Sequence, residues 1–317
     1  MRVVFFGTSP FAVPTLRALA ESEHDLLAVV TQPDRPSGRG MSLTPSAVKK
    51  AAEPLGLPIL QPERVRRNPF PAELAALAPD VLVVVSFGQI IPQKVLDIPK
   101  FGGINVHASL LPRWRGAAPI HWAIIEGDAQ TGVATMQMEA TLDTGPVFLE
   151  HIEPIGPNDT PEILEPRLAE AGATLLIDTL ARLAQEPDWQ PTPQATAGET
   201  YASMIDRTTG LIDPLAQSAA QIERRIRALS PRPGVHVALA DREVKLLSAS
   251  VEPGDGSLGT VLSVGKDGIR IGTTDGVLCI TRLQSPGKPA MDAWTWQNGA
   301  RLQPGDKASI LPSNSEG

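Results

Sequence analysis

Residues 81–86 read VLVVVS, an aliphatic run with no alternation of apolar and polar residues. Such a run predicts a strand buried on both faces, because a strand with one solvated face alternates apolar and polar side chains. Further apolar runs predict strands at 2–6, 26–31, 104–108 and 133–138, and helical spacing predicts helices at 15–23 and 45–55. Strands separated by helices predict an α/β fold with a doubly wound, mostly parallel, Rossmann-like sheet.

The composition changes near residue 186. Residues 186–201 read EPDWQPTPQATAGETY, with three prolines and few aliphatic residues, which is typical of a connection between domains. A predicted helix at 217–229 and five short strand-like runs follow, at 235–240, 244–249, 259–264, 269–273 and 277–283. Five short strands separated by glycine turns predict a small OB-like β-barrel. We therefore expect a first domain at 1–186, a linker at 187–207 and a second domain at 208–317.

Composition excludes several classes of protein. Hydrophobic residues make up 42% and charged residues 20% of the 317 residues, which is ordinary globular usage. The single cysteine excludes an internal disulfide or a multi-cysteine metal site, so we expect no metal and a reducing, cytoplasmic location. The longest aliphatic run is far shorter than a membrane span, and the apolar run at 3–6 is too short for a signal-peptide core. With a net charge of −7, binding of nucleic acid would need a local basic patch.

The richest stretch for chemistry is 101–120, FGGINVHASLLPRWRGAAPI. Asn105 and His107 are two residues apart on a predicted strand, so their side chains share one face. They also lie near the carboxyl end of that strand, where open α/β sheets bind ligands. By itself the pair is also compatible with a strand edge that carries two incidental polar residues.

A second candidate is Asp143, in the segment TLDTGPV at 141–147. An aspartate in this position commonly caps a turn. Together with Asn105 and His107, however, it completes a set for acyl transfer. The imidazolium of His107 and the amide of Asn105 can both donate to an oxyanion, and Asp143 can hold the imidazole charged and accept or relay a proton. Since no G-x-S-x-G elbow is present, the set favours direct transfer to an amine through a tetrahedral intermediate.

Two basic segments are candidates for contact with phosphates. The loop at 31–46, TQPDRPSGRGMSLTPS, carries Arg35 and Arg39 and predicts either a solvated loop or a basic arm for a nucleic-acid backbone. Arg224 and Arg227 are three residues apart and share a face of the predicted helix at 217–229. That face is either merely solvated or a second phosphate-binding patch.

The sequence resembles the folate-dependent formyltransferases over nearly its whole length. The resemblance rests on VVFFGTSPFAVPTL, VVVSFGQIIP, NVHASLLPRWRGAAPI, GVATMQMEATLDTGPV and IRALSPRPG, and the loop PDRPSGRG narrows it to the methionyl-tRNA formyltransferases. It implies transfer of a formyl group from 10-formyltetrahydrofolate to the α-amine of methionine on initiator tRNA, in translation initiation, with Asn105, His107 and Asp143 as the catalytic residues. The resemblance also implies folate contacts at two segments, which consist of Phe87, Gly88, Gln89, Ile90, Ser109, Leu110, Leu111 and Pro112.

The resemblance also implies tRNA binding through Arg35 to Arg39 and through the OB-like domain. Met41 and Ser42 stand where basic residues follow the loop in the family, so Arg224 and Arg227 are hypothesised to compensate. Three alternatives remain: a formyltransferase for an amino-sugar nucleotide, a formyltetrahydrofolate hydrolase, and a non-catalytic folate- or RNA-binding module. We expect a monomer without membrane contact.

Overall fold

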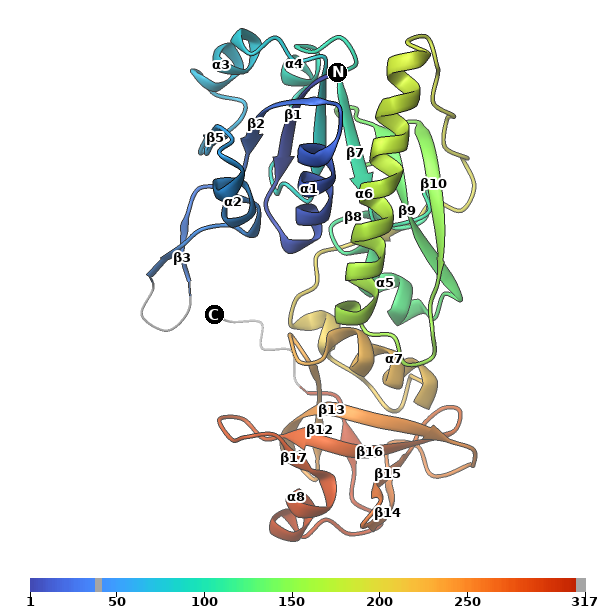
Figure 1. Ribbon diagram of the computed structural model, residues 1–317. Coiled ribbons are helices and arrows are strands. Elements are labelled where there is room, and N and C mark those ends of the chain that lie inside the picture. Colours follow the sequence, from blue (N-terminus) through green and yellow to red (C-terminus); the bar gives the residue numbers. More distant parts are fainter. Residues whose placement is uncertain (38–41, 312–317) are drawn as a thin grey trace. The chain divides into compact units, whose positions relative to one another are not determined.

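The computed structural model describes residues 1–37 and 42–311 (Figure 1). The chain divides into two compact units, each assembled from several segments. Unit 1 comprises Met1–Ile120, Gln130–Pro154 and Glu162–Ala202, and unit 2 comprises His121–Ala129, Ile155–Pro161 and Ser203–Gly317.

Unit 1 is built on a seven-stranded sheet in the order β10-β9-β7-β6-β1-β2-β5. Its strands are β1 (Arg2–Gly7), β2 (Asp25–Val30), β5 (Ile59–Leu60), β6 (Val81–Val85), β7 (Gly103–His107), β9 (Gln130–Gln137) and β10 (Val147–Pro154). The first five of these pair in parallel, whereas β9 and β10 are antiparallel to their neighbours. The predicted α/β, mostly parallel sheet is confirmed.

Helices pack on this sheet. They are α1 (Val13–Glu21), α2 (Ala47–Ala52), α3 (Phe70–Ala76), α4 (Gln93–Leu96) and α6 (Pro161–Gln185). Helix α5 (Pro119–Glu126) belongs mostly to unit 2. The long helix α6 runs alongside strands β7, β9 and β10 in Figure 1. Gly172 allows its close approach, because a Cβ at this position would come within 2.8 Å of Val106 Cγ1.

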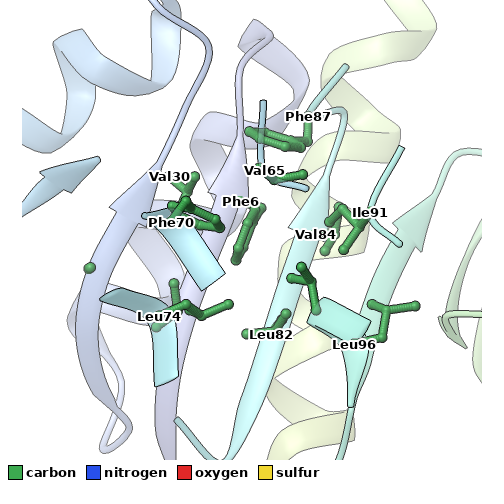
Figure 2. Packing of buried hydrophobic residues seen from close by; sticks show 13 residues of the cluster. Phe6, Val30, Val65, Phe70, Leu74, Leu82, Val84, Phe87, Ile91 and Leu96 are labelled. Carbon is green, nitrogen blue, oxygen red and sulfur yellow. The ribbon is translucent and has the colours of Figure 1, made fainter. Parts of the chain in front are cut away.

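The core explains why β6 carries no polar residue. All five side chains of β6 are buried, as expected for a strand covered on both faces. On one face, Phe6 meets the rings of Phe70 and Phe87 edge-on, with centroids 6.1 Å and 5.2 Å away (Figure 2). This edge-to-face packing anchors Phe87, the first residue of a predicted folate segment, at the end of β6.

Unit 2 contains a curled antiparallel sheet in the order β14-β15-β16-β13-β12-β18, with β17 also paired to β16. Its elements are α7 (Ala219–Leu229), β12 (Val235–Leu239), β13 (Arg242–Glu252), β14 (Val261–Gly265), β15 (Gly268–Gly272), β16 (Val277–Gln284), β17 (Met291–Asp292), α8 (Ala293–Ala300) and β18 (Ala308–Ser309). The five predicted strands become β12 to β16, and the predicted helix becomes α7. This curled antiparallel sheet confirms the expected OB-like, barrel-type second domain.

Part of the segment 187–207 pairs with unit 1. Thr192 exchanges backbone hydrogen bonds with Val147 of unit 1, and β11 (Tyr201–Ala202) pairs in parallel with β8 (Arg115–Gly116). Residues 192–202 therefore pack on unit 1, because their backbone groups find partners there. The composition of the segment, poor in aliphatic residues, did not indicate this.

The loop at 31–46 also contains structure that the sequence did not predict. Two short strands, β3 (Arg35–Ser37) and β4 (Ser42–Thr44), pair antiparallel. Within the described residues, no helix combines the length and apolar character needed to cross a membrane, and no group of three or more His, Cys, Asp or Glu residues is arranged to hold a metal ion.

Candidate active site

Strand β7 positions the first two candidate residues. Asn105 pairs with Val84 on β6 and Met136 on β9, and His107 pairs with Ala134 on β9. Neighbours on both sides therefore fix the backbone of β7, and the alternation along the strand places both side chains on one face. His107 is the last residue of the strand, and only 6% of its side chain is exposed. This is the carboxyl end of the parallel strands.

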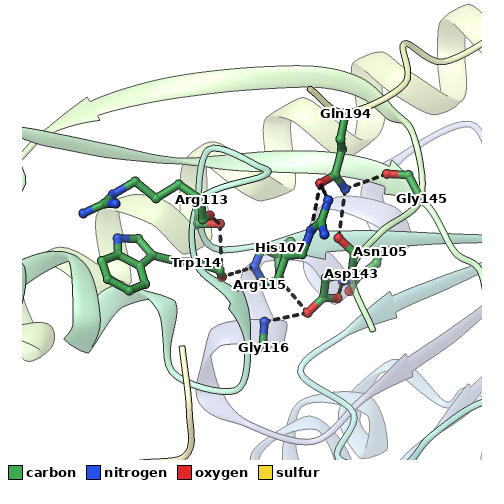
Figure 3. Close-up of polar contacts among 10 residues, drawn as sticks. Asn105, His107, Arg113, Trp114, Arg115, Gly116, Asp143, Gly145 and Gln194 are labelled. Atoms are coloured by element: carbon green, nitrogen blue, oxygen red, sulfur yellow. Dashed lines mark hydrogen bonds and ion pairs between the residues drawn. The ribbon is translucent and has the colours of Figure 1, made fainter. Parts of the chain in front are cut away.

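Asp143 lies in the connection between β9 and β10, and the fold brings it to the other two residues (Figure 3). Its Oδ1 lies 3.5 Å from Asn105 Nδ2, and its Oδ2 lies 3.8 Å from His107 Nδ1. The carboxylate is 13% exposed. Asp143 has a φ of 52°, which is uncommon for a residue other than glycine.

The backbone determines which nitrogen of His107 carries a proton. His107 Nε2 lies 2.9 Å from the carbonyl oxygen of Trp114. A carbonyl oxygen can only accept, so Nε2 must donate. The other nitrogen, Nδ1, faces the carboxylate of Asp143 and is the one that can exchange a proton. Ser109 helps to hold this turn, because its hydroxyl donates to the carbonyl of Arg113 over 2.6 Å.

Gly116 holds the carboxylate from the opposite side. Its backbone N–H donates to Asp143 Oδ2 over 2.9 Å. Gly116 has a φ of 116°, and a Cβ there would lie 2.7 Å from the carbonyl oxygen of Ala202. Only glycine therefore permits this approach. The segment around Ala202 thus fixes the turn that binds Asp143.

This arrangement has the parts needed for acyl transfer. Nδ1 of His107, when protonated, and the amide of Asn105 are donors on the same face of β7, and the carboxylate of Asp143 lies beside both. Donors held in advance by strand and backbone contacts stabilise a developing oxyanion without reorganising. The carboxylate of Asp143 is a group that can accept a proton from an attacking amine.

The two predicted folate segments follow neighbouring parallel strands. Residues 87–90 come after β6 and residues 109–112 come after β7, so both lie at the edge of the sheet that holds His107. Gln89 has a structural partner on each side of its amide, since it accepts from Val65 N (3.0 Å) and donates to Pro62 O (3.2 Å). Ile90 is 84% exposed and offers an apolar contact at this edge.

The predicted tRNA arm is described only in part, because Arg39 and Met41 lie outside the described residues. Arg35 is exposed and forms an ion pair with Glu63 at 2.9 Å. Just before it, hydrogen bonds from Lys49 and Gln61 lower the pKa of the Asp34 carboxyl group. These bonds anchor the base of the arm to unit 1.

The two arginines of α7 have partners within unit 2. Arg224 Nε donates to the carbonyl of Ile125 over 3.0 Å and packs over Gly127, where a Cβ would lie 2.8 Å from Nε. Arg227 Nη1 donates to the carbonyl of Asp159 over 2.6 Å, and its Nε pairs with Glu223. Both guanidinium groups therefore hold the segments 121–129 and 155–161 against α7.

We expect these contacts to contribute to stability. Replacing Arg224 and Arg227 together by alanine leaves two carbonyls without their charged donors, and each such bond contributes about 1.5–3 kcal/mol. The double variant should therefore melt several degrees below the wild type in a thermal denaturation experiment. The matched control is Arg242→Ala, an exposed arginine of the same unit. An unchanged melting temperature together with a smaller salt dependence of tRNA binding would instead assign both arginines to phosphate contacts.

Sequence patterns did not point to every residue at this site. Arg115 and Gln194 both join the network around Asp143, as Figure 3 shows. Arg115 is one of two arginines in the segment RWRG at 113–116. Gln194 lies in the proline-rich segment 186–201, where no sequence motif indicates a role at the active site.

Comparisons with known proteins agree with the resemblance seen in the sequence. The family model described as formyl transferase matches residues 1–180, and the model described as formyl transferase, C-terminal domain, matches residues 204–301. A methionyl-tRNA formyltransferase of Citrifermentans bemidjiense is 46% identical over 96% of this chain and 95% of that protein. A methionyl-tRNA formyltransferase of Pseudomonas putida is 48% identical over 92% of this chain and 93% of that protein.

Solved structures show the same fold at low sequence identity. An N-formyltransferase from Helicobacter canadensis, in complex with folinic acid and dTDP-3-aminofucose, superposes with a TM-score of 0.67 at 17% identity, over 88% of this chain and 99% of that one. HypX from Aquifex aeolicus, in complex with tetrahydrofolic acid, gives a TM-score of 0.60 at 20% identity, over 94% of this chain and 47% of that one. Given the identity to relatives along nearly its whole length, the chain belongs to the methionyl-tRNA formyltransferase family.

Proposed function

We propose that this protein transfers the formyl group of 10-formyltetrahydrofolate to the α-amino group of methionine on initiator methionyl-tRNA, in the cytoplasm. The relatives that carry the name methionyl-tRNA formyltransferase match more than nine-tenths of the chain, which favours this substrate over an amino sugar or water. The observation that carries the chemistry is the convergence of Asn105, His107 and Asp143 at the carboxyl end of β7.

The proposed reaction is a direct acyl transfer. The methionine amine attacks the formyl carbon, a C–N bond forms, and the carbonyl oxygen becomes an oxyanion. His107 Nδ1 and the Asn105 amide donate to that oxyanion, while Asp143 accepts the proton lost by the amine. When the carbonyl re-forms, the bond from the formyl carbon to N10 of the folate breaks, and N10 takes up a proton. No covalent enzyme intermediate is needed.

The substrates extend beyond this centre. We propose that the folate contacts segments 87–90 and 109–112, since both follow strands that end beside His107. Arg35 and Arg39 remain the proposed tRNA-binding residues of unit 1, and a monomer remains a prediction. Arg224 and Arg227 already hold backbone carbonyls, which favours the loop over α7 as the main phosphate contact in the proposal.

A panel of formyl acceptors tests the function. The purified protein is incubated with 10-formyltetrahydrofolate and either charged initiator methionyl-tRNA, an amino-sugar nucleotide, or buffer alone, and formylated product and free formate are measured. We expect rapid formylation of the methionyl-tRNA, and only background product with the sugar or water. Faster turnover of the sugar nucleotide, or release of formate at the same rate without tRNA, would contradict the proposal.

A further inference from the structure

The side-chain amide of Gln194 forms hydrogen bonds with the loop that carries Asp143 and with Arg115. Its Nε2 donates to the carbonyls of Asp143 (2.8 Å) and Gly145 (2.7 Å). Its Oε1 accepts from Arg115 Nε (3.1 Å) and Nη2 (2.8 Å). Carbonyls only accept and guanidinium groups only donate, so this arrangement fixes the orientation of the amide. Gln194 therefore ties the Asp143 loop to Arg115.

Asp143 needs such support. Its φ of 52° lies in the left-handed region, which is disfavoured for a residue with a Cβ and persists only where the surroundings hold it. The two carbonyls that Gln194 binds lie at Asp143 itself and two residues further on, so they bracket the turn. Without these bonds, the backbone of Asp143 is free to relax to a negative φ, and its carboxylate turns away from His107.

Arg115 connects the main chain of Asp143 with its side chain. Its guanidinium is nearly buried, binds Gln194 and forms an ion pair with Glu199 at 2.7 Å. The next residue, Gly116, donates its N–H to Asp143 Oδ2. Gln194 thus binds the carbonyl of Asp143, and Gly116 binds its carboxylate. Both hydrogen bonds depend on the position of β8, because β8 carries Gly116 and Arg115, the partner of Gln194. Figure 3 shows this closed arrangement.

We propose that Gln194 is a positioning residue that sets the carboxylate of Asp143 against Nδ1 of His107. The inference rests on the proposed function, because it assumes that Asp143 works through His107. It assigns a catalytic consequence to the segment after α6: residues 192–202 hold the reacting carboxylate in place as well as connecting the two units along the chain.

The variant Gln194→Glu tests this directly. Glutamate has nearly the same size and keeps the pairing with Arg115, but its carboxylate repels the carbonyls of Asp143 and Gly145. We expect kcat to fall about 10- to 100-fold, as for a displacement of about 1 Å near reacting groups, with KM for folate and for methionyl-tRNA within about twofold. The matched control is Gln190→Glu, which adds the same charge at an exposed glutamine of the same segment.

A double variant separates positioning from a general loss of structure. On an Asp143→Asn background, Gln194→Glu should lower kcat less than about threefold, because residues that act as a unit give non-additive losses. Equal fold-losses on both backgrounds, or a wild-type kcat in Gln194→Glu alone, would overturn the inference. If Gln194→Glu does not fold, Gln194→Ala is judged by the same criterion. Full activity of the Asp143→Asn variant would overturn the proposed mechanism as well. If Asp143→Asn is impaired but Gln194→Glu is fully active, only the positioning role of Gln194 is rejected.

Discussion

Replacing His107 by alanine should lower kcat by about 10²–10³ while leaving folate binding intact, because the loss of one oxyanion donor costs about 3–4 kcal/mol of transition-state stabilisation. The imidazole lies at the end of β7 with Nδ1 3.8 Å from Oδ2 of Asp143, and it is the proposed oxyanion donor. The variant also loses the hydrogen bond from Nε2 to the carbonyl of Trp114, which contributes about 1 kcal/mol to stability. The fold should therefore survive.

The measurement is single-turnover formylation of methionyl-tRNA at saturating folate, with folate affinity measured separately by fluorescence or calorimetry. His151→Ala is the matched control, since His151 lies on β10 in the same unit with 46% of its side chain exposed. Near-wild-type turnover of purified His107→Ala would remove this histidine from the mechanism.

Replacing Asp143 by asparagine should cause a loss of similar size. The substitution keeps the volume and an oxygen that can accept from Gly116, so the loop retains its shape. It removes the negative charge beside His107 Nδ1 and the group proposed to accept a proton from the amine. Steady-state kcat for formylation is the readout, and Asp97→Asn is the control, because Asp97 is an exposed residue of unit 1.

The pair of substitutions shows whether the two residues act together. If Asp143 works mainly through His107, the double variant His107→Ala, Asp143→Asn should be little slower than the slower of the two single variants. Losses that multiply in the double variant would show that the residues act independently. In that case Asp143 would be a proton acceptor without influence on the imidazole.

The local pattern of apolar and polar residues predicted much of the central sheet of unit 1. The unbroken aliphatic run at 81–85 indicated a central strand covered on both faces, and the structure buries all five side chains of β6. The period of two along β7 placed Asn105 and His107 on one face, next to the edge where ligands bind. These predictions were confirmed because the patterns that they use are local. Residues close together in the sequence remain close together in a strand, so the order of apolar and polar residues shows which side chains share a face.

One long helix and the direction of one strand were not predicted. Helix α6 carries Pro166 in its second turn, and no helix was predicted at 161–185. Strand β9 was expected at 133–138 but begins at Gln130, and it runs antiparallel to β7. The direction of a strand is set by its connections, whereas the hydrophobic pattern of the strand is the same either way.

The sequence by itself determined which residue types are available for acyl transfer and on which strand face Asn105 and His107 lie. The tertiary structure alone decided that Asp143 comes within 3.8 Å of His107, that Gln194 holds its loop, and that Arg224 and Arg227 bind backbone carbonyls. Asp143 and Gln194 are 51 residues apart. Their contact depends on how β8, β9 and the segment after α6 are arranged in the fold. The pattern of residues within any one of these segments does not indicate that arrangement.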